Sequence, residues 1–126
     1  MMGILSDMII GVGVDIIEIY RIQNACNKKS FLNKIYTQRE IDEFDGRFKS
    51  LAGNFAVKEA VSKAFGTGIR GFDIKDIEVL RNDAGMPYVI LYNNAKAISD
   101  KLGVKNIFVS ISHNLDNAIG YAIVEG

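Results

Sequence analysis

Hydrophobic and polar residues alternate with the period of a strand near the start of the chain. In residues 8–17, MIIGVGVDII, four branched aliphatic residues share one face of an extended segment. Gly11, Gly13, Asp15 and Ile17 share the other face. The pattern predicts a strand whose second face has no side chains at its two glycines, next to an aspartate.

Helical spacing follows this strand. The pattern predicts a helix over residues 20–28 and a short helix over residues 37–44. The second begins with TQRE, which has the form of a capping box with Thr37 as the N-cap and Glu40 reaching back. A longer helix is predicted over residues 50–65.

The C-terminal half is predicted to hold two pairs of strands. The pattern indicates strands within 76–92 around a turn at 82–85, a helix over 94–102, and strands over 106–113 and 118–125 around a turn at 114–117. Runs of helices and of hairpin strands favour an α+β fold over regular strand–helix repetition. We expect a mainly antiparallel sheet with the long helix packed on it.

Composition limits the kinds of function that the chain can have. A length of 126 residues with 48% hydrophobic residues predicts one compact domain over residues 1–126. Fifteen basic and fifteen acidic residues cancel, so no overall field would gather nucleic acid or a membrane surface. The single Cys26 excludes an internal disulfide and favours the cytoplasm. Residues 1–7 look like an N-terminal extension without a secretory signal, and Met8 is an alternative start.

The long helix carries a face of polar residues. Glu59, Ser62 and Lys63 are predicted to project together, while small and branched residues fill the packed side. A surface ion pair between Glu59 and Lys63, worth about 0.3–0.5 kcal/mol, and a C-cap at Gly66 would account for this face. The conjunction with Asp15 favours a chemical role instead.

Asp15 and Glu59 are candidate ligands of a hard cation. Mg²⁺ usually takes one or two protein carboxylates and leaves its other positions to water and phosphate oxygens. Lys63 would then pair with a phosphate as a point charge. Charge, metal and nearby amides together suit a pyrophosphate. The alternative for Asp15 is a strand-end aspartate that caps the following helix.

The end of the long helix offers backbone amides to such a ligand. Gly66, Thr67 and Gly68 could approach it closely, because glycine allows close contact. Familiar phosphate motifs do not account for the pattern, since GVGVDI lacks the third glycine of GxGxxG and no GxxxxGK[ST] occurs. His113 is the only histidine, so it lacks a second histidine for a zinc site.

Three segments together resemble a known family. GVGVDIIEIYRI at 11–22, FAVKEAVSKAFGTG at 55–68 and SISHNLDNAIGYAIVE at 110–125 are similar to the holo-[acyl-carrier-protein] synthases, the short bacterial 4'-phosphopantetheinyl transferases. The resemblance implies a compact α+β homotrimer. It also implies transfer of the phosphopantetheine arm of coenzyme A to a serine of apo acyl carrier protein. This reaction uses Mg²⁺ and releases adenosine 3',5'-bisphosphate.

The resemblance also implies roles for single residues. Asp15 and Glu59 match two metal-binding carboxylates, and Lys63 matches a lysine expected on the pyrophosphate. The serine proton could pass to Glu59 or to a water on the metal, and the sequence leaves both open. Ser112 and His113 match a motif near the nucleotide end of coenzyme A. For His113 taken alone, the alternative is a partly buried structural histidine.

A turn in the C-terminal half matches a further coenzyme A contact. Gly85 and Pro87 match a turn that the family places against coenzyme A from a neighbouring subunit. Met86 between them, and Asn54 in the long helix, stand where a basic residue is common in relatives. We expect these two departures to remove two cations near the 3'-phosphate and so to affect coenzyme A affinity.

Basic residues early in the chain are candidates for binding the carrier protein. Arg21 matches a basic position that faces the acidic carrier, and Lys28 and Lys29 would extend that face. The alternative is a solvated basic helix end stabilised by the helix dipole. Two other functions stay open: the same fold acting on another carrier domain, and a non-catalytic trimer that binds coenzyme A or a nucleotide. The short chain argues against the first, and retention of Asp15 and Glu59 against the second.

Overall fold

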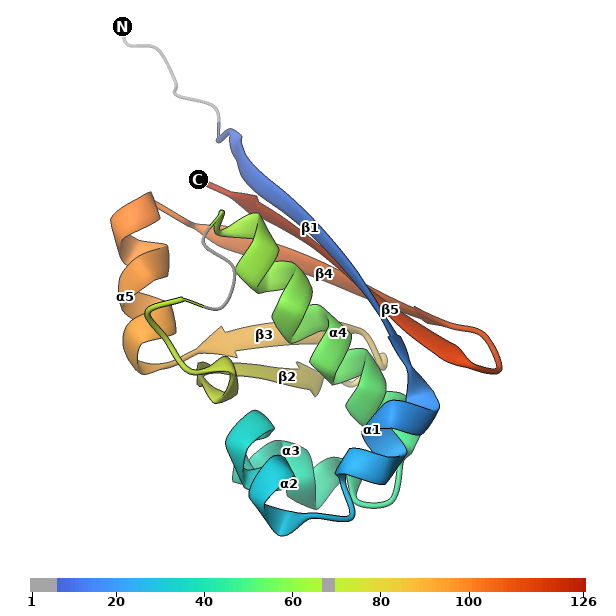
Figure 1. Cartoon of the computed structure of the whole chain (residues 1–126). Coiled ribbons are helices and arrows are strands. Elements are labelled where there is room, and N and C mark those ends of the chain that lie inside the picture. The colour runs from blue at the N-terminus through green and yellow to red at the C-terminus, as the bar shows by residue number, and fades with distance from the viewer. Residues whose placement is uncertain (1–6, 67–69) are drawn as a thin grey trace, which may run out of the picture.

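The computed structural model describes residues 7–66 and 70–126 (Figure 1). In chain order its elements are β1 (Ile9–Glu18), α1 (Ile19–Ala25), α2 (Lys29–Ile35), α3 (Gln38–Phe44), α4 (Phe48–Ala64), a 3₁₀ turn (Ile74–Asp76), β2 (Ile77–Arg81), β3 (Pro87–Leu91), α5 (Asn93–Leu102), β4 (Asn106–His113) and β5 (Asn117–Glu125). The predicted elements all occur near their expected positions. The sequence pattern did not predict α2, a seven-residue helix too short to establish a clear period.

The strands form two antiparallel sheets rather than one. β5 lies between β1 and β4 in a three-stranded sheet, and β2 pairs with β3 in a second sheet. The long helix α4 runs between the two sheets (Figure 1). The α+β class, the antiparallel pairing and the long packed helix are therefore as predicted. The division of the strands into two sheets was not predicted.

The face of β1 that carries Gly11 and Gly13 is the face that packs on α4. A Cβ added to Gly11 would lie 1.8 Å from the carbonyl oxygen of Ala64, and one added to Gly13 would lie 1.8 Å from that of Ala60. Gly120 of β5 approaches α4 in the same way, since its Cβ would lie 2.4 Å from the backbone nitrogen of Val57. Only glycine permits this contact between helix and strand backbones.

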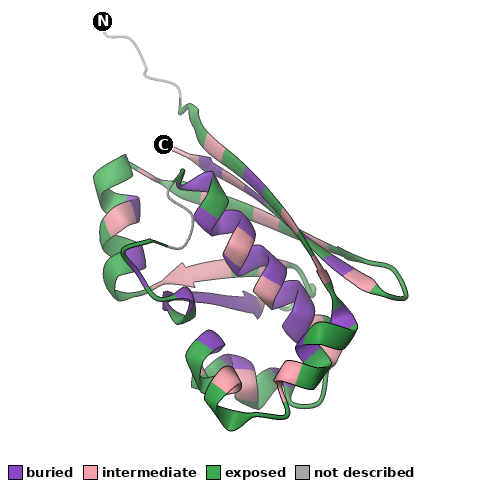
Figure 2. Ribbon diagram, in the orientation of Figure 1, coloured by how far each residue is buried: buried purple, intermediate pink, exposed green. Residues whose placement is uncertain are grey.

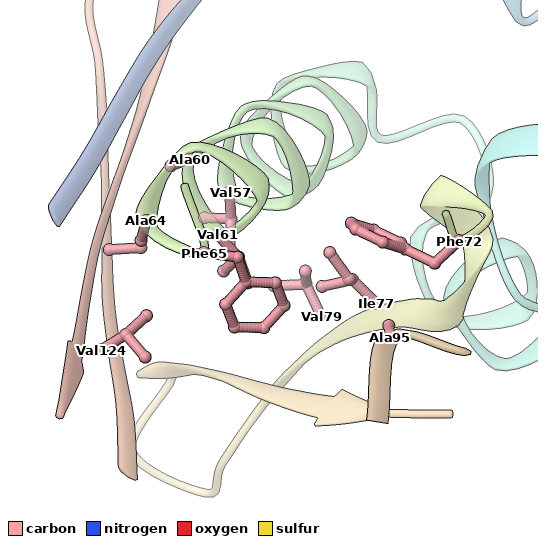
Figure 3. Close-up of a cluster of buried hydrophobic side chains, with 11 residues drawn as sticks. Val57, Ala60, Val61, Ala64, Phe65, Phe72, Ile77, Val79, Ala95 and Val124 are labelled. Carbon is pink, nitrogen blue, oxygen red and sulfur yellow. The ribbon is translucent and has the colours of Figure 1, made fainter. Parts of the chain in front are cut away.

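The main core lies between α4 and the two sheets. Figure 2 shows α4 as mostly buried, and Figure 3 shows Val57 and Val61 directed toward Ile77 and Val79 of β2. A second cluster joins α1, α2 and α3 to the N-terminal part of α4, with Tyr36 and Phe44 among its buried members. Both clusters share α4, so the helix is held along its whole length.

A network of polar side chains is buried among α3, α4 and β2. Lys58 Nζ donates hydrogen bonds to Glu40 Oε1 at 2.8 Å and to the carbonyl oxygen of Ile77. Glu40 completes the predicted capping box, because it accepts from the Thr37 amide at 3.1 Å while the Glu40 amide donates to the Thr37 hydroxyl at 3.2 Å. A long-range ion pair therefore joins two helices inside the fold.

Two residues of α4 point into the interior, contrary to expectation. Ser62 is buried and donates to the carbonyl oxygen of Lys58 at 2.9 Å, so it does not share the exposed face with Glu59 and Lys63. Asn54 is also buried, and its side-chain amide donates to Glu40 Oε2 at 3.0 Å and to the carbonyl oxygen of Val79 at 2.9 Å. Position 54 therefore belongs to the internal network in this chain.

The outer face of the three-stranded sheet is apolar and uncovered in the single chain. Its exposed members are Ile10, Val12, Val14 and Ile16 of β1, Phe108 of β4, and Ile119 and Tyr121 of β5. They alternate along each strand with the residues that pack on α4, as strand geometry requires. We call these seven residues the open sheet face.

The described chain ends lie side by side. The amide of Met8 donates to the carbonyl oxygen of Gly126 at 3.0 Å, and Asp7 pairs with Lys105 at 3.1 Å. The rest of the predicted N-terminal extension lies outside the described residues. Over residues 7–66 and 70–126, no helix combines the length and apolar character needed to cross a membrane.

Candidate functional site

The structure brings Asp15, Glu59 and Lys63 together where β1 crosses α4. Lys63 Nζ donates to Asp15 Oδ1 at 3.1 Å and to the carbonyl oxygen of Val14 at 3.0 Å. Lys63 thus pairs with Asp15 across the two elements rather than with Glu59 along the helix. The alternative role of Asp15 as a helix cap is wrong, because Asp15 lies within β1 and Glu18 precedes α1.

The charge of Asp15 reaches Glu59. Partial burial raises the pKa of Glu59, the negative charge of Asp15 raises it further, and Lys63 lowers it. Two carboxylates that repel each other in this way are stabilised by a cation between or beside them. Lys63 supplies one positive charge to the two carboxylates, which leaves a further cation to balance the other.

The donor set of this cluster suits a hard divalent cation. Among the residues that the structure describes, no group of three or more His, Cys, Asp or Glu side chains could hold a metal. The two carboxylates of Asp15 and Glu59 are as many as Mg²⁺ usually takes from a protein when water and phosphate oxygens fill its other positions. A closed structural zinc site would need four ligands, usually with cysteine or histidine among them.

The backbone amide of Gly66, at the end of α4, was expected to contact a ligand but is already hydrogen-bonded. Gly66 has a φ of 80°, and its amide donates to the carbonyl oxygen of Lys63 at 2.9 Å. This amide therefore serves the helix end, as the C-cap alternative requires. Thr67 and Gly68, the other two candidates for amide contacts, lie outside the described residues.

Ser112 and His113 end β4 near the start of α4. Both are exposed, and His113 Nε2 lies 3.1 Å from the carbonyl oxygen of Lys49 in the first turn of the helix. A Cβ at Gly53 would lie 3.3 Å from the same ring nitrogen, so the glycine leaves room for the imidazole. The structural alternative is supported in part, because the ring contacts the helix backbone at Lys49 and Gly53 although the residue as a whole is exposed. A glycine inside a helix, as at position 53, is the sequence signal for this contact.

The turn between β2 and β3 places Gly85 and Pro87 at the surface. Gly85 has a φ of 84°, and its amide donates to the carbonyl oxygen of Asn82 at 2.9 Å. Met86 is 61% exposed beside them. The predicted turn is confirmed, and its tip is free to meet a ligand or another chain.

Two arginines near this turn were not singled out in the sequence. Arg81 lies opposite Pro87 in the β2–β3 ladder, and its guanidinium lies 4.9 Å from the ring centre of Phe44. Arg47, the residue before α4, lies 5.5 Å from the same ring. Both cations therefore meet over one buried aromatic ring. Arg47 is only three residues from Phe44, but no local spacing brings Arg81 of β2 to the same ring.

The nucleotide-end candidates and the carboxylates lie toward opposite ends of α4. His113 contacts Lys49 and Gly53 at the start of the helix, whereas Lys63 belongs to its last turn. At about 1.5 Å per residue, Lys49 and Lys63 are roughly 21 Å apart along the axis. A single chain therefore does not gather all the candidate residues around one point.

The basic candidates Arg21, Lys28 and Lys29 are exposed. Arg21 lies on α1, which ends at Ala25, so the two lysines lie beyond that helix and begin α2 instead. The alternative of lysines stabilised by a helix dipole is therefore wrong, because a cation is disfavoured at a helix N-terminus.

Comparison with known proteins agrees with this arrangement. Residues 11–122 match the model of the 4'-phosphopantetheinyl transferase superfamily. A holo-[acyl-carrier-protein] synthase of Clostridium perfringens is 57% identical in an alignment that covers 94% of this chain and 96% of the relative.

Solved structures share the fold. The holo-[acyl-carrier-protein] synthase of Neisseria meningitidis superposes with a TM-score of 0.86 at 30% identity, over 94% of this chain and 100% of that chain. The Helicobacter pylori enzyme in complex with coenzyme A gives a TM-score of 0.79 at 32% identity, over 90% and 98%. This chain therefore belongs to the holo-[acyl-carrier-protein] synthases of the 4'-phosphopantetheinyl transferase superfamily.

Proposed function

We propose that this chain transfers the 4'-phosphopantetheine group of coenzyme A to a serine of apo acyl carrier protein in a Mg²⁺-dependent reaction. The observation that carries the proposal is the cluster of Asp15, Glu59 and Lys63 where β1 crosses α4. Two carboxylates and one lysine are the charges that a metal-assisted reaction at a pyrophosphate needs. The family membership supplies the substrates.

The reaction exchanges the phosphoanhydride bond of coenzyme A for a phosphoester bond to serine. The serine hydroxyl oxygen forms a bond to the β-phosphorus of coenzyme A, the pyrophosphate bond to the α-phosphate breaks, and adenosine 3',5'-bisphosphate leaves with the electron pair. The serine proton is lost during the attack. Asp15 and Glu59 would hold Mg²⁺, which when bound neutralises charge on the phosphate oxygens.

The residues of this chain contribute charge and position. Lys63 would neutralise phosphate oxygens as the pyrophosphate bond breaks, which is the main requirement in phosphoryl transfer. Glu59 is a candidate to accept the serine proton, and a water molecule is the alternative acceptor.

The nucleotide end of coenzyme A would lie toward the start of α4. Ser112, His113, Gly85 and Pro87 are exposed or half-buried on the hairpins there, and Arg47 and Arg81 add positive charge near the turn. The arginines would provide charge for the 3'-phosphate that Met86 does not. Because the 3'-phosphate and the pyrophosphate are attached to the same ribose, they cannot span the length of α4, so the carboxylates that meet this pyrophosphate would come from another chain.

A homotrimer with shared sites accounts for the open sheet face. An apolar surface that includes Val12, Val14, Ile16 and Phe108 would be costly to leave in water and is typical of an interface. Burial of this face between copies would also bring the exposed residues of one chain near the carboxylates of another. The separation of His113 from Lys63 in one chain supports sites built from two chains.

The remaining assignments concern the carrier, the domain and the compartment. Arg21, Lys28 and Lys29 form an exposed basic surface suited to an acidic carrier protein. We treat the chain as one transferase domain, because α4 is shared by both hydrophobic clusters. The unpaired Cys26 supports a cytoplasmic location.

Mass spectrometry of the carrier tests the proposed reaction. Apo acyl carrier protein incubated with this chain, coenzyme A and Mg²⁺ should gain the mass of one phosphopantetheine. Asp15→Asn and Glu59→Gln variants should lose at least about a thousandfold in rate, because charge neutralisation by the cation is worth several kcal/mol. Normal turnover of either variant would reject the cation site.

A peptidyl carrier domain in the same assay tests the first alternative. Modification of that domain in preference to acyl carrier protein would favour the same fold with another carrier. Binding of coenzyme A without any mass gain on either carrier would favour the non-catalytic alternative.

A further inference from the structure

Lys63 holds the carboxylate that a cation would need. Its Nζ lies 3.1 Å from Asp15 Oδ1 and 3.0 Å from the carbonyl oxygen of Val14, so two oxygens of β1 face one ammonium group. The Asp15 side chain is 19% exposed and the Lys63 side chain is 52% exposed. The carboxylate is therefore fixed and partly shielded, whereas the lysine reaches it from solvent.

We propose that Lys63 is a built-in counter-ion of Asp15 that competes with the divalent cation and turns toward the phosphate ligand when the cation binds. The inference rests on the proposed function and concerns the same cluster. Lys63 would thus have two positions, one on Asp15 before the cation binds and one on the substrate afterwards.

The charges of the cluster require this exchange. Ionised Asp15 and Glu59 with protonated Lys63 sum to one negative charge, and a divalent cation changes the sum to one positive charge. The ammonium group would then lie beside a cation at the same carboxylate, where like charges repel. Lys63 can leave, because lysine has a flexible four-carbon stem and water can replace its two oxygen partners. An anion would then meet a cluster with net positive charge.

The exchange has a measurable cost. A cation that binds Asp15 meets a carboxylate already paired with Lys63 through Oδ1, so Lys63 weakens cation binding in the free protein even though it assists the reaction. Removal of the ammonium group should therefore tighten cation binding while it impairs transfer. A lysine that merely stabilised the fold would not produce this opposite pair of effects.

Manganese provides the probe. Free Mn²⁺ gives an electron paramagnetic resonance signal that bound Mn²⁺ loses, so titration of the chain without coenzyme A yields a dissociation constant. We expect the Lys63→Met variant to bind Mn²⁺ roughly three- to tenfold more tightly than the unchanged chain, because an ion pair of this exposure and one repulsive charge are removed. Lys63→Arg should restore the unchanged affinity, since arginine keeps the charge.

Two further variants show whether the change in Mn²⁺ affinity arises at Asp15. Lys96 on α5 forms an exposed pair with Asp100, so Lys96→Met removes the same charge from the same kind of pair elsewhere. Its Mn²⁺ affinity should match that of the unchanged chain within about twofold, because distant surface charges are screened. Asp15→Asn should bind Mn²⁺ far more weakly. Circular dichroism verifies that each variant is folded.

The outcomes separate the inference from the proposed function. Tighter binding by Lys63→Met alone supports the competition. Equal or weaker binding by Lys63→Met, with Asp15→Asn still defective, overturns the competition and leaves the cation site intact. An equal gain in Lys96→Met overturns it too, because net charge would then explain the result. Absence of Mn²⁺ binding in both the unchanged chain and Lys63→Met overturns the cation site itself, and the competition with it.

Discussion

Gly13 of β1 lies against Ala60 of α4 so closely that a Cβ on Gly13 would be 1.8 Å from the Ala60 carbonyl oxygen. The same face of β1 carries Asp15 two residues later, and Glu59 precedes Ala60 on the helix. The close contact of the two backbones therefore holds the elements that carry the two carboxylates of the candidate site against each other.

Gly13→Ala should destabilise the fold and the site together. The methyl group would meet helix backbone, which cannot rotate away, so we expect a loss of about 2–3 kcal/mol in the free energy of unfolding. Gly46→Ala is the control, because no atom lies within 4 Å of its added Cβ and only its φ of 72° is unfavourable. Urea denaturation compares the two. A smaller loss for Gly13→Ala than for Gly46→Ala would contradict the close packing.

Lys58→Met should be strongly destabilising. It would leave the buried carboxylate of Glu40 without its ammonium partner, which typically costs about 3–5 kcal/mol. Adding Glu40→Gln should recover part of the loss, because a neutral amide costs less to bury. Lys96→Met, at an exposed pair, should cost at most about 0.5 kcal/mol in the same denaturation experiment. No recovery in the double variant would argue against an electrostatic cause.

Glu59→Gln should stabilise the cation-free protein near neutral pH. Folding raises the pKa of Glu59, so the unfolded chain ionises more readily and the native state loses stability as the pH rises through the folded pKa. The variant cannot ionise and escapes this loss. Thermal melts in a chelator should show a higher Tm for Glu59→Gln at pH 7, and the gain should vanish below about pH 4, where the wild-type carboxyl is protonated in both states. A variant less stable at both pH values would refute this.

Arg21→Glu should weaken recognition of the carrier. Charge reversal on an exposed helix would repel an acidic partner, so we expect the KM for acyl carrier protein to rise about three- to tenfold while the KM for coenzyme A changes little. Added salt should reduce the difference, because it screens exposed charges. Lys101→Glu, at an exposed site on α5, is the matched control. If both reversals had the same effect on the carrier KM, α1 would not be the docking surface.

A Glu59→Ala chain and a His113→Ala chain should complement each other when they are refolded together. Each variant is expected to be inactive alone. In a mixed trimer, some sites would combine an intact carboxylate group from one chain with an intact His113 from another, so part of the activity should return. An active monomer in sedimentation at the assay concentration would overturn the trimer. A trimer without complementation would place both residues of each site in the same chain.

The sequence by itself determined the local elements and the family. Strand periodicity, the Thr37–Glu40 capping box and the Asn82–Gly85 turn depend on residues that are neighbours along the chain, so their structures could be predicted. The same holds for the motifs around Asp15, Glu59 and His113, which are continuous segments. The helix α2 was missed, because a helix of seven residues shows barely two turns of periodicity, and the short 3₁₀ turn at Ile74–Asp76 was missed as well.

The tertiary structure alone decided which remote residues meet. Periodicity separated the two faces of β1 but could not show that the glycine face would pack on α4 and leave Val12 and Val14 exposed. The spacing along the helix allowed Lys63 to pair with Glu59, but β1 brings Asp15 to Lys63 instead. Lys58 and Asn54 lie in a buried network because α3 and β2 supply Glu40 and a backbone carbonyl. Such contacts depend on the packing of whole elements, and no local pattern encodes it.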